Sequence, residues 1–508
     1  MAKKNLSDKE IENLLMYEEI PSDTDSFAGG DGSDRDQSKI EEIPQGEQQL
    51  LLGEDLFPSD EEFDSEDEVP LSQLLGRIQP ATQAVPLLAQ TVRPPKWKKA
   101  YTILAPDNFT TASNLPDETT SLAASQQMTP LKILNLLWTD DIMQHVTFHT
   151  NLYAEQKGGT YKPVAADEMP VFIALNLVMG VKKSPSYRDY WSSSPDLRDE
   201  YISHFMSLSR FSWILGNLHL NDNNLLPSRN NPDYDKLYKI RPFTEMLRES
   251  YKKNYNHTEK IAIDESMIKF KGRSCLKQYM PKKPIKRGYK VWTKCASSGY
   301  CLDFDIYSGK VGNKVETNLG GNVVRKFCEG LADKNHKVYF DNYFNSYELQ
   351  VDLRQKNIYA CGTVNESRKH LPTLKSDKQL KRGEYDYRVS DNQMASFMKW
   401  KDKRCVLILT NFHDPRNEVH VRRTEKTGER VEVPCPLALK DYNENMNFVD
   451  KFDQLKGSYA IDRKSKKWWH RIFFHFIDCT VVNAFIIYNC VSRTLDDMFI
   501  RICWHLLI

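Results

Sequence analysis

The sequence predicts an α/β core that follows an all-helical segment and an acidic N-terminal tail. Residues 1–92 contain 22 Asp and Glu against 6 Lys and Arg. Acidic runs of this kind bury too little apolar surface to fold, so we expect this tail to be disordered. Residues 129–259 have apolar positions at helical spacing. From Lys260 onwards, β-type runs alternate with helical stretches, which is typical of an α/β fold.

The charge is unevenly distributed along the 508 residues. The formal net charge is only +1, but the tail carries a net −16 and the rest of the chain a net +17. A basic body suits binding to a polyanion, and nucleic acid is the commonest polyanion. No two of the ten cysteines have CxxC spacing, so we expect neither a zinc site nor a redox motif.

Two further features of the composition concern cellular location. The first fifteen residues, MAKKNLSDKEIENLL, are too polar for a signal peptide. We find no apolar run of about 18 residues, so we expect no membrane-spanning helix. Together these features predict an intracellular protein with reduced cysteines that makes no membrane contact.

Residues 93–128 are predicted to be a basic linker. The linker opens with RPPKWKKAY, in which Trp97 lies among basic residues. Such a stretch could contact DNA, could act as a nuclear import signal or could be a plain connection.

The segment 129–259 is predicted to be helical throughout. We expect helices over Thr129–Lys157, over the almost wholly apolar Met169–Val181, over a stretch that ends near Leu220 and over residues 239–255. By composition this segment is a scaffold and not a catalytic centre.

Acidic residues stand at the ends of two β-type runs and on one predicted helix. KIAIDE contains Asp264 and HKVYFDN contains Asp341, and in NFVDKFDQLKGSYAID the residues Asp450 and Asp453 share one helical face. A ribonuclease-H-like fold gathers two strand-end acids and one helix acid around divalent metal. We therefore predict a ribonuclease-H-like catalytic core in which Asp264, Asp341 and Asp450 bind Mg²⁺, or Mn²⁺ in its place, with Asp453 beside Asp450.

Residues 371–436 lie between the second acid and the helix acids. They are basic and rich in turn residues, with a strand expected over 404–411 and another near Glu432. We interpret them as an insertion domain that divides the catalytic core into residues 260–370 and 437–456.

Each acid also has a plainer interpretation. Asp264 could be a turn residue at a strand end, Asp341 could form an Asx turn, and the helix pair could be a solvated face. Glu265, Asp303 and Asp305 are candidates by position, with less support.

Two basic stretches are candidates for contact with DNA phosphates. The first follows Asp264 and contributes Lys271, Arg273, Lys282, Lys283, Lys286 and Arg287. The second follows the helix acids and contributes Arg463, Lys464, Lys466, Lys467, Trp468 and Arg471. In the alternative interpretation, the charges of the second stretch are merely solvated while its tryptophans enter the core.

Several of these motifs resemble the piggyBac transposase family. The resemblance is carried by IAIDESMIKFKGRSCLKQYMPKKPIKRGYKVW, VYFDNYFNSYEL and NFVDKFDQLKGSYAIDRKSKKWW, and it extends from about Leu131 to Asn489. It implies a cut-and-paste DNA transposase that uses three aspartates and Mg²⁺ at transposon ends flanked by TTAA. By motif position these aspartates are Asp264, Asp341 and Asp450, with Asp453 as a supporting acid.

The resemblance also implies an organisation into domains. A split helical domain for dimerisation and DNA binding would comprise residues 129–259 and 457–508, and it implies a nuclear homodimer. The family's cysteine-rich zinc-binding domain has no counterpart in the final stretch SRTLDDMFIRICWHLLI. Two functions therefore stand side by side: a transposase, and a domesticated DNA-binding protein that no longer transposes.

Overall fold

The computed structural model describes residues 93–110, 115–117, 119–120, 129–281, 283–309, 318–425, 427–458, 460–461 and 463–492. The predicted acidic tail, Lys282 and residues 493–508 lie outside the described residues.

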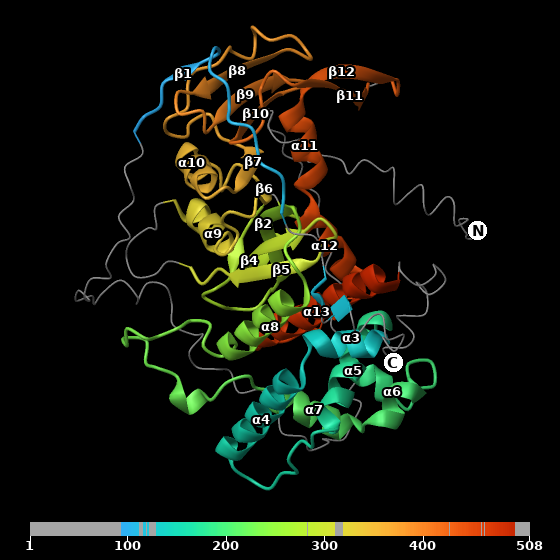
Figure 1. The fold of residues 1–508 in the computed structure, drawn as a ribbon. Coiled ribbons are helices and arrows are strands. Elements are labelled where there is room, and N and C mark those ends of the chain that lie inside the picture. The colour runs from blue at the N-terminus through green and yellow to red at the C-terminus, as the bar shows by residue number, and fades with distance from the viewer. Residues whose placement is uncertain are drawn as a thin grey trace, which may run out of the picture. The chain divides into compact units, whose positions relative to one another are not determined.

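A ten-stranded mixed sheet organises the described part of the chain (Figure 1). At one end of the sheet β5 pairs with β4, β4 with β2, β2 with β6 and β6 with β7. β2, β6 and β7 run parallel, whereas β4 and β5 are antiparallel to their neighbours. These five strands are β2 (Lys260–Lys269), β4 (Arg287–Ala296), β5 (Cys301–Ile306), β6 (Lys337–Phe340) and β7 (Tyr359–Thr363). This mixed sheet with its helices fits the predicted ribonuclease-H-like core.

The sheet continues through the segment that the sequence set apart as an insertion. β8 (Tyr385–Ser390), β9 (Ser396–Lys401) and β10 (Cys405–Thr410) form an antiparallel meander. β10 then pairs with β7, so the segment extends the core sheet instead of starting a separate one. β3 (Gln278–Tyr279) is a short strand on the other edge, paired with β4.

Two smaller features flank this part of the sheet. β11 (Glu418–Thr424) and β12 (Arg430–Pro436) form a separate hairpin that contacts α11 (Leu437–Asn445). At the sheet edge, β1 (Trp97–Lys98) pairs with β8. The Trp97 indole donates to the carbonyl of His370 at 2.8 Å, so the start of the predicted linker is fixed to the sheet.

The helical segment before the sheet has more breaks than the periodicity suggested. Its helices are α3 (Pro130–Leu137), α4 (Asp140–Lys157), α5 (Glu168–Val181), α6 (Glu200–Phe205), α7 (Leu208–Asn217) and α8 (Arg241–Asn254). The expected helix over 129–157 is two helices, because the Thr139 side chain caps a new start by accepting from the amide of Ile142. Ser207 caps the start of α7 in the same way and divides the helix expected to end near Leu220 into α6 and α7.

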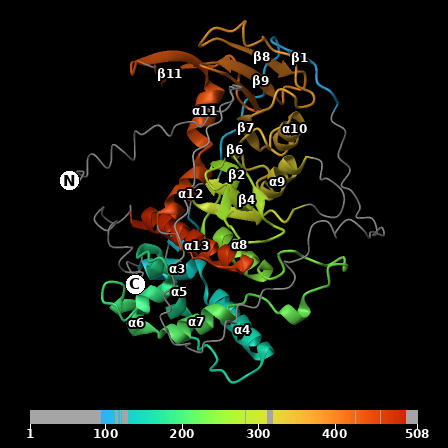
Figure 2. The same ribbon diagram turned by 180° about the vertical axis from the view of Figure 1, so that it is seen from behind.

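Helices from both ends of the chain share one hydrophobic core with the sheet. That core includes Ile133 of α3, Phe172 of α5, Ile261 of β2 and Phe473 of α13 (Trp468–Ser492). α13 contacts α3 and also α12 (Phe448–Gly457), which brings the end of the described chain back to the first helices (Figure 2). The remaining helices are α9 (Leu319–Phe327) and α10 (Tyr347–Gln355).

α13 corrects the expectation that the chain contains no long apolar run. By length and composition alone, its residues Trp468–Val491 could cross a membrane. However, 78% of its most apolar window is buried inside the protein, as is usual for a helix in a protein core. Asn483, for example, accepts from the Cys301 amide at 2.9 Å and donates to the Cys301 carbonyl at 3.0 Å.

Candidate active site

The first two predicted acids lie next to each other on neighbouring parallel strands. Ile263 of β2 pairs with Phe340 of β6, and each is followed directly by the aspartate, Asp264 or Asp341. Paired positions of parallel strands point to the same face and are roughly 5 Å apart. Two acids that are 77 positions apart in the sequence numbering therefore meet at one point of the sheet.

Asp341 also forms the Asx turn that was considered as an alternative. Its Oδ1 accepts from the Tyr343 amide at 2.8 Å. This contact fixes the carboxylate where β6 ends and leaves its second oxygen outside the turn. Asp341 can therefore form the Asx turn and belong to the acid cluster at the same time.

The helix acids approach from α12, which packs on β2 and β4. Ser266, two residues after Asp264 on the same strand face, donates its hydroxyl to Asp453 at 2.8 and 3.0 Å. Lys456, one turn later, approaches Asp453 at 2.6 Å. Ser266 therefore joins β2 to α12 through Asp453, and Lys456, which belongs to α12 itself, also reaches the Ser266 hydroxyl at 3.5 Å. Neither residue was among the predicted site residues.

Lys283 sits among the acids and not on an outer DNA-facing surface. Its ammonium lies 3.6 Å from Asp264 Oδ2 and donates to the Glu265 carbonyl at 3.1 Å. Burial alone would lower the pKa of Lys283, but the carboxylates of Asp264, Glu265, Asp450 and Asp341 together raise it. The charges of all three predicted metal ligands thus act on one ammonium, which forms an ion pair with Asp264.

The three carboxylates are electrostatically strained. Burial raises the pKa of Asp264 to about 7, with Lys283 opposing and the charge of Asp341 adding to the shift. Burial likewise raises the pKa of Asp341. Desolvation raises the pKa of Asp450, and the charge of Asp453 adds to it. A cluster of acids that resist ionisation is typical of a functional site, and a cation would relieve the repulsion.

The chemistry of the cluster fits a hard divalent cation, because such ions prefer carboxylate oxygens. In the described residues, no three His, Cys, Asp or Glu side chains stand close enough to hold an ion without adjustment. Asp450 is exposed on the first turn of α12.

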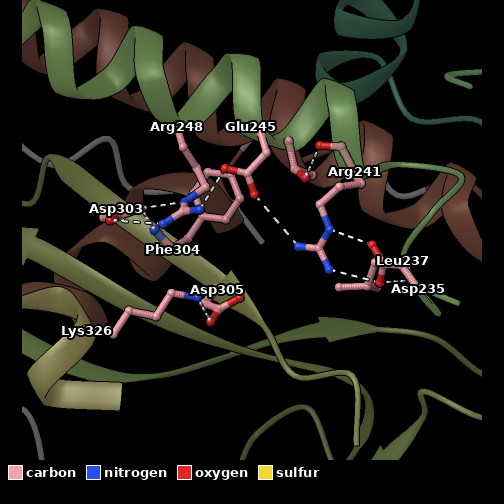
Figure 3. Close-up of polar contacts among 10 residues, drawn as sticks. Asp235, Leu237, Arg241, Glu245, Arg248, Asp303, Phe304, Asp305 and Lys326 are labelled. Atoms are coloured by element: carbon pink, nitrogen blue, oxygen red, sulfur yellow. Dashed lines mark hydrogen bonds and ion pairs between the residues drawn. The ribbon is translucent and has the colours of Figure 1, made fainter. Parts of the chain in front are cut away.

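The less favoured acids lie outside this cluster. Glu265 is buried and pairs with Lys290. Asp303 of β5 is held by Arg248 of α8 at 2.7 Å, and the next acid of that strand, Asp305, by Lys326 at 2.7 Å (Figure 3). The same figure shows that Arg248 of α8 connects the helical segment to β5 through Asp303, and that Glu245 and the Arg241–Asp235 pair lie beside it within the helical segment.

Most of the described residues of the first basic stretch lie on the surface. Lys271, Arg273, Lys286 and Arg287 are exposed. The Arg287 guanidinium lies 5.4 Å from the ring of Tyr279, which is itself 62% exposed. These residues remain predicted phosphate contacts.

The second basic stretch divides between the surface and the core. Lys464 and Lys466 are exposed, whereas the Lys467 ammonium donates to the Gly216 carbonyl at 2.6 Å. Trp468 is buried, and Arg471 donates to the carbonyls of Lys269 and Arg463.

Arg463 is buried, although it was predicted to contact DNA. Its guanidinium donates to Asn176 Oδ1 at 2.5 Å and packs on the rings of Tyr187, Phe211 and Phe474. Burial lowers its pKa to about 10. In this conformation its side chain holds α5 to the start of α13 and is not presented to a phosphate.

Comparison with known proteins identifies the family. A family model described as transposase IS4 matches residues 129–485. Human PiggyBac transposable element-derived protein 2 is 28% identical over 388 residues, which are 74% of this chain and 64% of that protein. The chain belongs to the piggyBac transposase family.

Other members of the piggyBac family extend the comparison. Human PiggyBac transposable element-derived protein 3 is 29% identical over 431 residues, covering 83% of this chain and 70% of that protein. A chain of the cryo-EM structure of a piggyBac transposase synaptic complex with hairpin DNA has a TM-score of 0.67 and 22% identity. The match covers 78% of this chain and 82% of that one, and at this identity it shows the fold alone. The match to human PiggyBac transposable element-derived protein 2 spans less than two thirds of the length of that protein.

Proposed function

We propose that the protein is a metal-dependent DNA transposase that cleaves and transfers strands at TTAA-flanked ends. The observation that carries the proposal is that Asp264 and Asp341 directly follow paired residues of the parallel strands β2 and β6, with the Lys283 ammonium 3.6 Å from Asp264. Paired Mg²⁺ ions, or Mn²⁺ in their place, would activate the attacking oxygen and neutralise the departing one when bound.

The chain's own residues divide the work of holding such ions. Asp264 and Asp341 stand on paired strands of the sheet, so their separation is set by the backbone. Asp450 would close the site from α12, and Asp453 holds that helix to β2 through the Ser266 hydroxyl. Lys271, Arg273, Lys286, Arg287, Lys464 and Lys466 would hold the phosphates of the duplex around the site.

The wider organisation is proposed on the same basis. Residues 129–259 and 457–508 would form the split helical domain for dimerisation and double-stranded DNA, a division supported by the packing of α13 on α3. Residues 260–370 and 437–456 would be the catalytic core and 371–436 its insertion. A homodimer that acts on chromosomal DNA would work in the nucleus.

A second function is favoured by one specific observation. Lys283 already neutralises part of the charge of the cluster, and the described residues hold no ready-made ion site. A domesticated protein could keep this fold and bind DNA without cleaving it. The two proposals differ in whether the acids do chemistry.

A cleavage assay separates them. Purified protein is incubated with linear duplex DNA that carries candidate transposon ends flanked by TTAA, in Mg²⁺ or in EDTA, alongside the Asp341→Asn variant. The transposase proposal predicts nicks or hairpins that need Mg²⁺ and disappear in the variant. Salt-sensitive binding without cleavage would favour the DNA-binding protein.

A further inference from the structure

The tip of one hairpin carries Lys283 into the acid cluster. The hairpin runs from β3 into β4, where Gln278 pairs with Gly288 and Tyr279 with Arg287. Within the turn, the Met280 amide donates to the Lys286 carbonyl at 2.9 Å. The base of the hairpin is packed so closely that a Cβ at Gly288 would lie 1.8 Å from the Ile268 carbonyl oxygen. The base is therefore rigidly placed, and the tip projects towards the aspartates.

The Lys283 ammonium lies beside the Asp264 carboxylate, where a bound cation would lie. It lies 3.6 Å from Asp264, beyond the 3.2 Å of a good hydrogen bond but within the range of an ion pair. The side chain is 29% exposed and that of Asp264 is 15% exposed, so water screens the pair only in part. Lys286, three residues along the same hairpin, is exposed, whereas Lys283 is only partly so.

A divalent ion and this ammonium compete for the same oxygens. Any cation held by Asp264 and Asp341 would repel an ammonium that stays within about 4 Å of Asp264. The flexible four-carbon side chain of Lys283, with its strongly hydrated ammonium, is well suited to leave. Asp264 within β2 and Asp341 directly after β6 are instead placed by the sheet.

We propose that Lys283 is the resident counter-ion of the aspartate cluster and that a divalent metal displaces it. Lys283 is in this sense a positioning residue: it holds the acids together until metal arrives and then turns out of the cluster towards the phosphates of bound DNA. The inference rests on the proposed function, because it requires that the aspartates bind metal.

The first test uses the unmodified full chain and Mn²⁺ alone, without DNA. An amine-reactive reagent labels lysines in the metal-free and the Mn²⁺-loaded protein, and mass spectrometry quantifies each site. Displacement predicts that Mn²⁺ increases the labelling of Lys283 about fivefold or more while Lys286 is unchanged, since an ion-paired amine becomes accessible. Equal labelling of Lys283 at saturating Mn²⁺ would overturn the inference.

The second test measures Mn²⁺ affinity by electron paramagnetic resonance. Lys283→Met removes the competing charge and should tighten Mn²⁺ binding about tenfold, whereas Lys283→Arg and the matched control Lys286→Met should remain close to the unmodified protein. Unchanged or weaker binding by Lys283→Met would contradict displacement. If Lys283→Met folds only in Mn²⁺, that dependence supports the counter-ion role, and Lys283→Gln then provides the affinity.

The Asp341→Asn variant keeps this inference distinct from the proposed function. If Mn²⁺ binds the Asp341→Asn variant as tightly as it binds the unmodified protein, the proposed metal site is wrong. If Asp341→Asn weakens Mn²⁺ binding but Lys283→Met leaves it unchanged, the metal site stands and only the displacement of Lys283 is wrong.

Discussion

Asp450 and Asp453 lie almost one turn apart on α12, yet we predict that they contribute very differently to the stability of the metal-free protein. Asp453 is embedded in contacts: two hydrogen bonds from Ser266 and an ion pair with Lys456 at 2.6 Å. Asp450 is exposed, and desolvation and its acidic neighbour disfavour its charge. Replacing each with asparagine keeps the side-chain shape and removes only the charge.

The expected cost follows from what each change leaves behind. Asp453→Asn leaves the Lys456 ammonium without this carboxylate partner. The Lys456 side chain is only 11% exposed, and its burial disfavours the charged form, so losing the partner is costly. Breaking a fully buried pair costs about 3–5 kcal/mol. Because the Asp453 side chain is 34% exposed and its asparagine can still accept from Ser266, we expect about 2 kcal/mol.

Asp450→Asn should change the stability by less than about 1 kcal/mol. The loss of a favourable acid in the first helical turn and the relief of repulsion within the cluster act in opposite directions. Both effects are modest for an exposed side chain.

Urea unfolding in EDTA, followed by circular dichroism, measures the difference directly. The unfolding midpoint should fall clearly for Asp453→Asn and stay close to the unmodified value for Asp450→Asn. Equal midpoints, or a larger loss for Asp450→Asn, would refute the role of Asp453 as the anchor of α12.

The remaining predictions concern pH, DNA binding and the hairpin base. The pKa of Asp264 in the folded protein, about 7, exceeds its ordinary value of 3.8, so the folded protein binds this proton more tightly than the unfolded chain does. Stability in EDTA should therefore decline as the pH rises from about 4 through 7. Urea unfolding at pH 5 and pH 8 measures this decline, which Asp264→Asn should flatten. Replacing Lys464 and Lys466 together with glutamine should reduce the slope of log affinity against log salt by about two units for any duplex. Arg463→Met should leave the slope unchanged, because Arg463 is buried. If the lysines are only a solvated face, the slope will be unchanged in both variants. Gly288→Ala should destabilise the protein by about 3 kcal/mol or more, because its Cβ would meet the rigid carbonyl of Ile268, and an unaltered midpoint of unfolding would show that the hairpin base yields.

The sequence contained local information that was enough for the acids and for most helices. A short apolar run that ends in an aspartate is visible at Asp264 and Asp341, and both runs are strands in the structure. The spacing of Asp450 and Asp453 predicted a helix, which is α12. The Ser266 contact had a local signal too, because a residue two positions after Asp264 shares its strand face.

Features that depend on distant partners could not be read in the same way. The pairing of β10 with β7 joins Ile408 to Thr363, and neither run reveals its partner. The sequence therefore could not show that strands of the predicted insertion continue the core sheet. Arg463 meets Asn176 across 287 positions, and only that tertiary contact turns a basic residue into a buried one. Lys283 looked like any lysine of a basic stretch until the hairpin placed it beside Asp264.

The central claim is that Asp341 belongs to a metal site that cleaves DNA, and a change of ligand tests it most directly. Asp341→Cys replaces a carboxylate with a softer thiolate, which binds Mg²⁺ poorly and Mn²⁺ better. Strand cleavage of a TTAA-flanked duplex is measured for the unmodified protein and the variant in each metal. We predict that the variant is inactive in Mg²⁺ and regains part of its cleavage in Mn²⁺. Cleavage in Mg²⁺ at the rate of the unmodified protein would contradict the account.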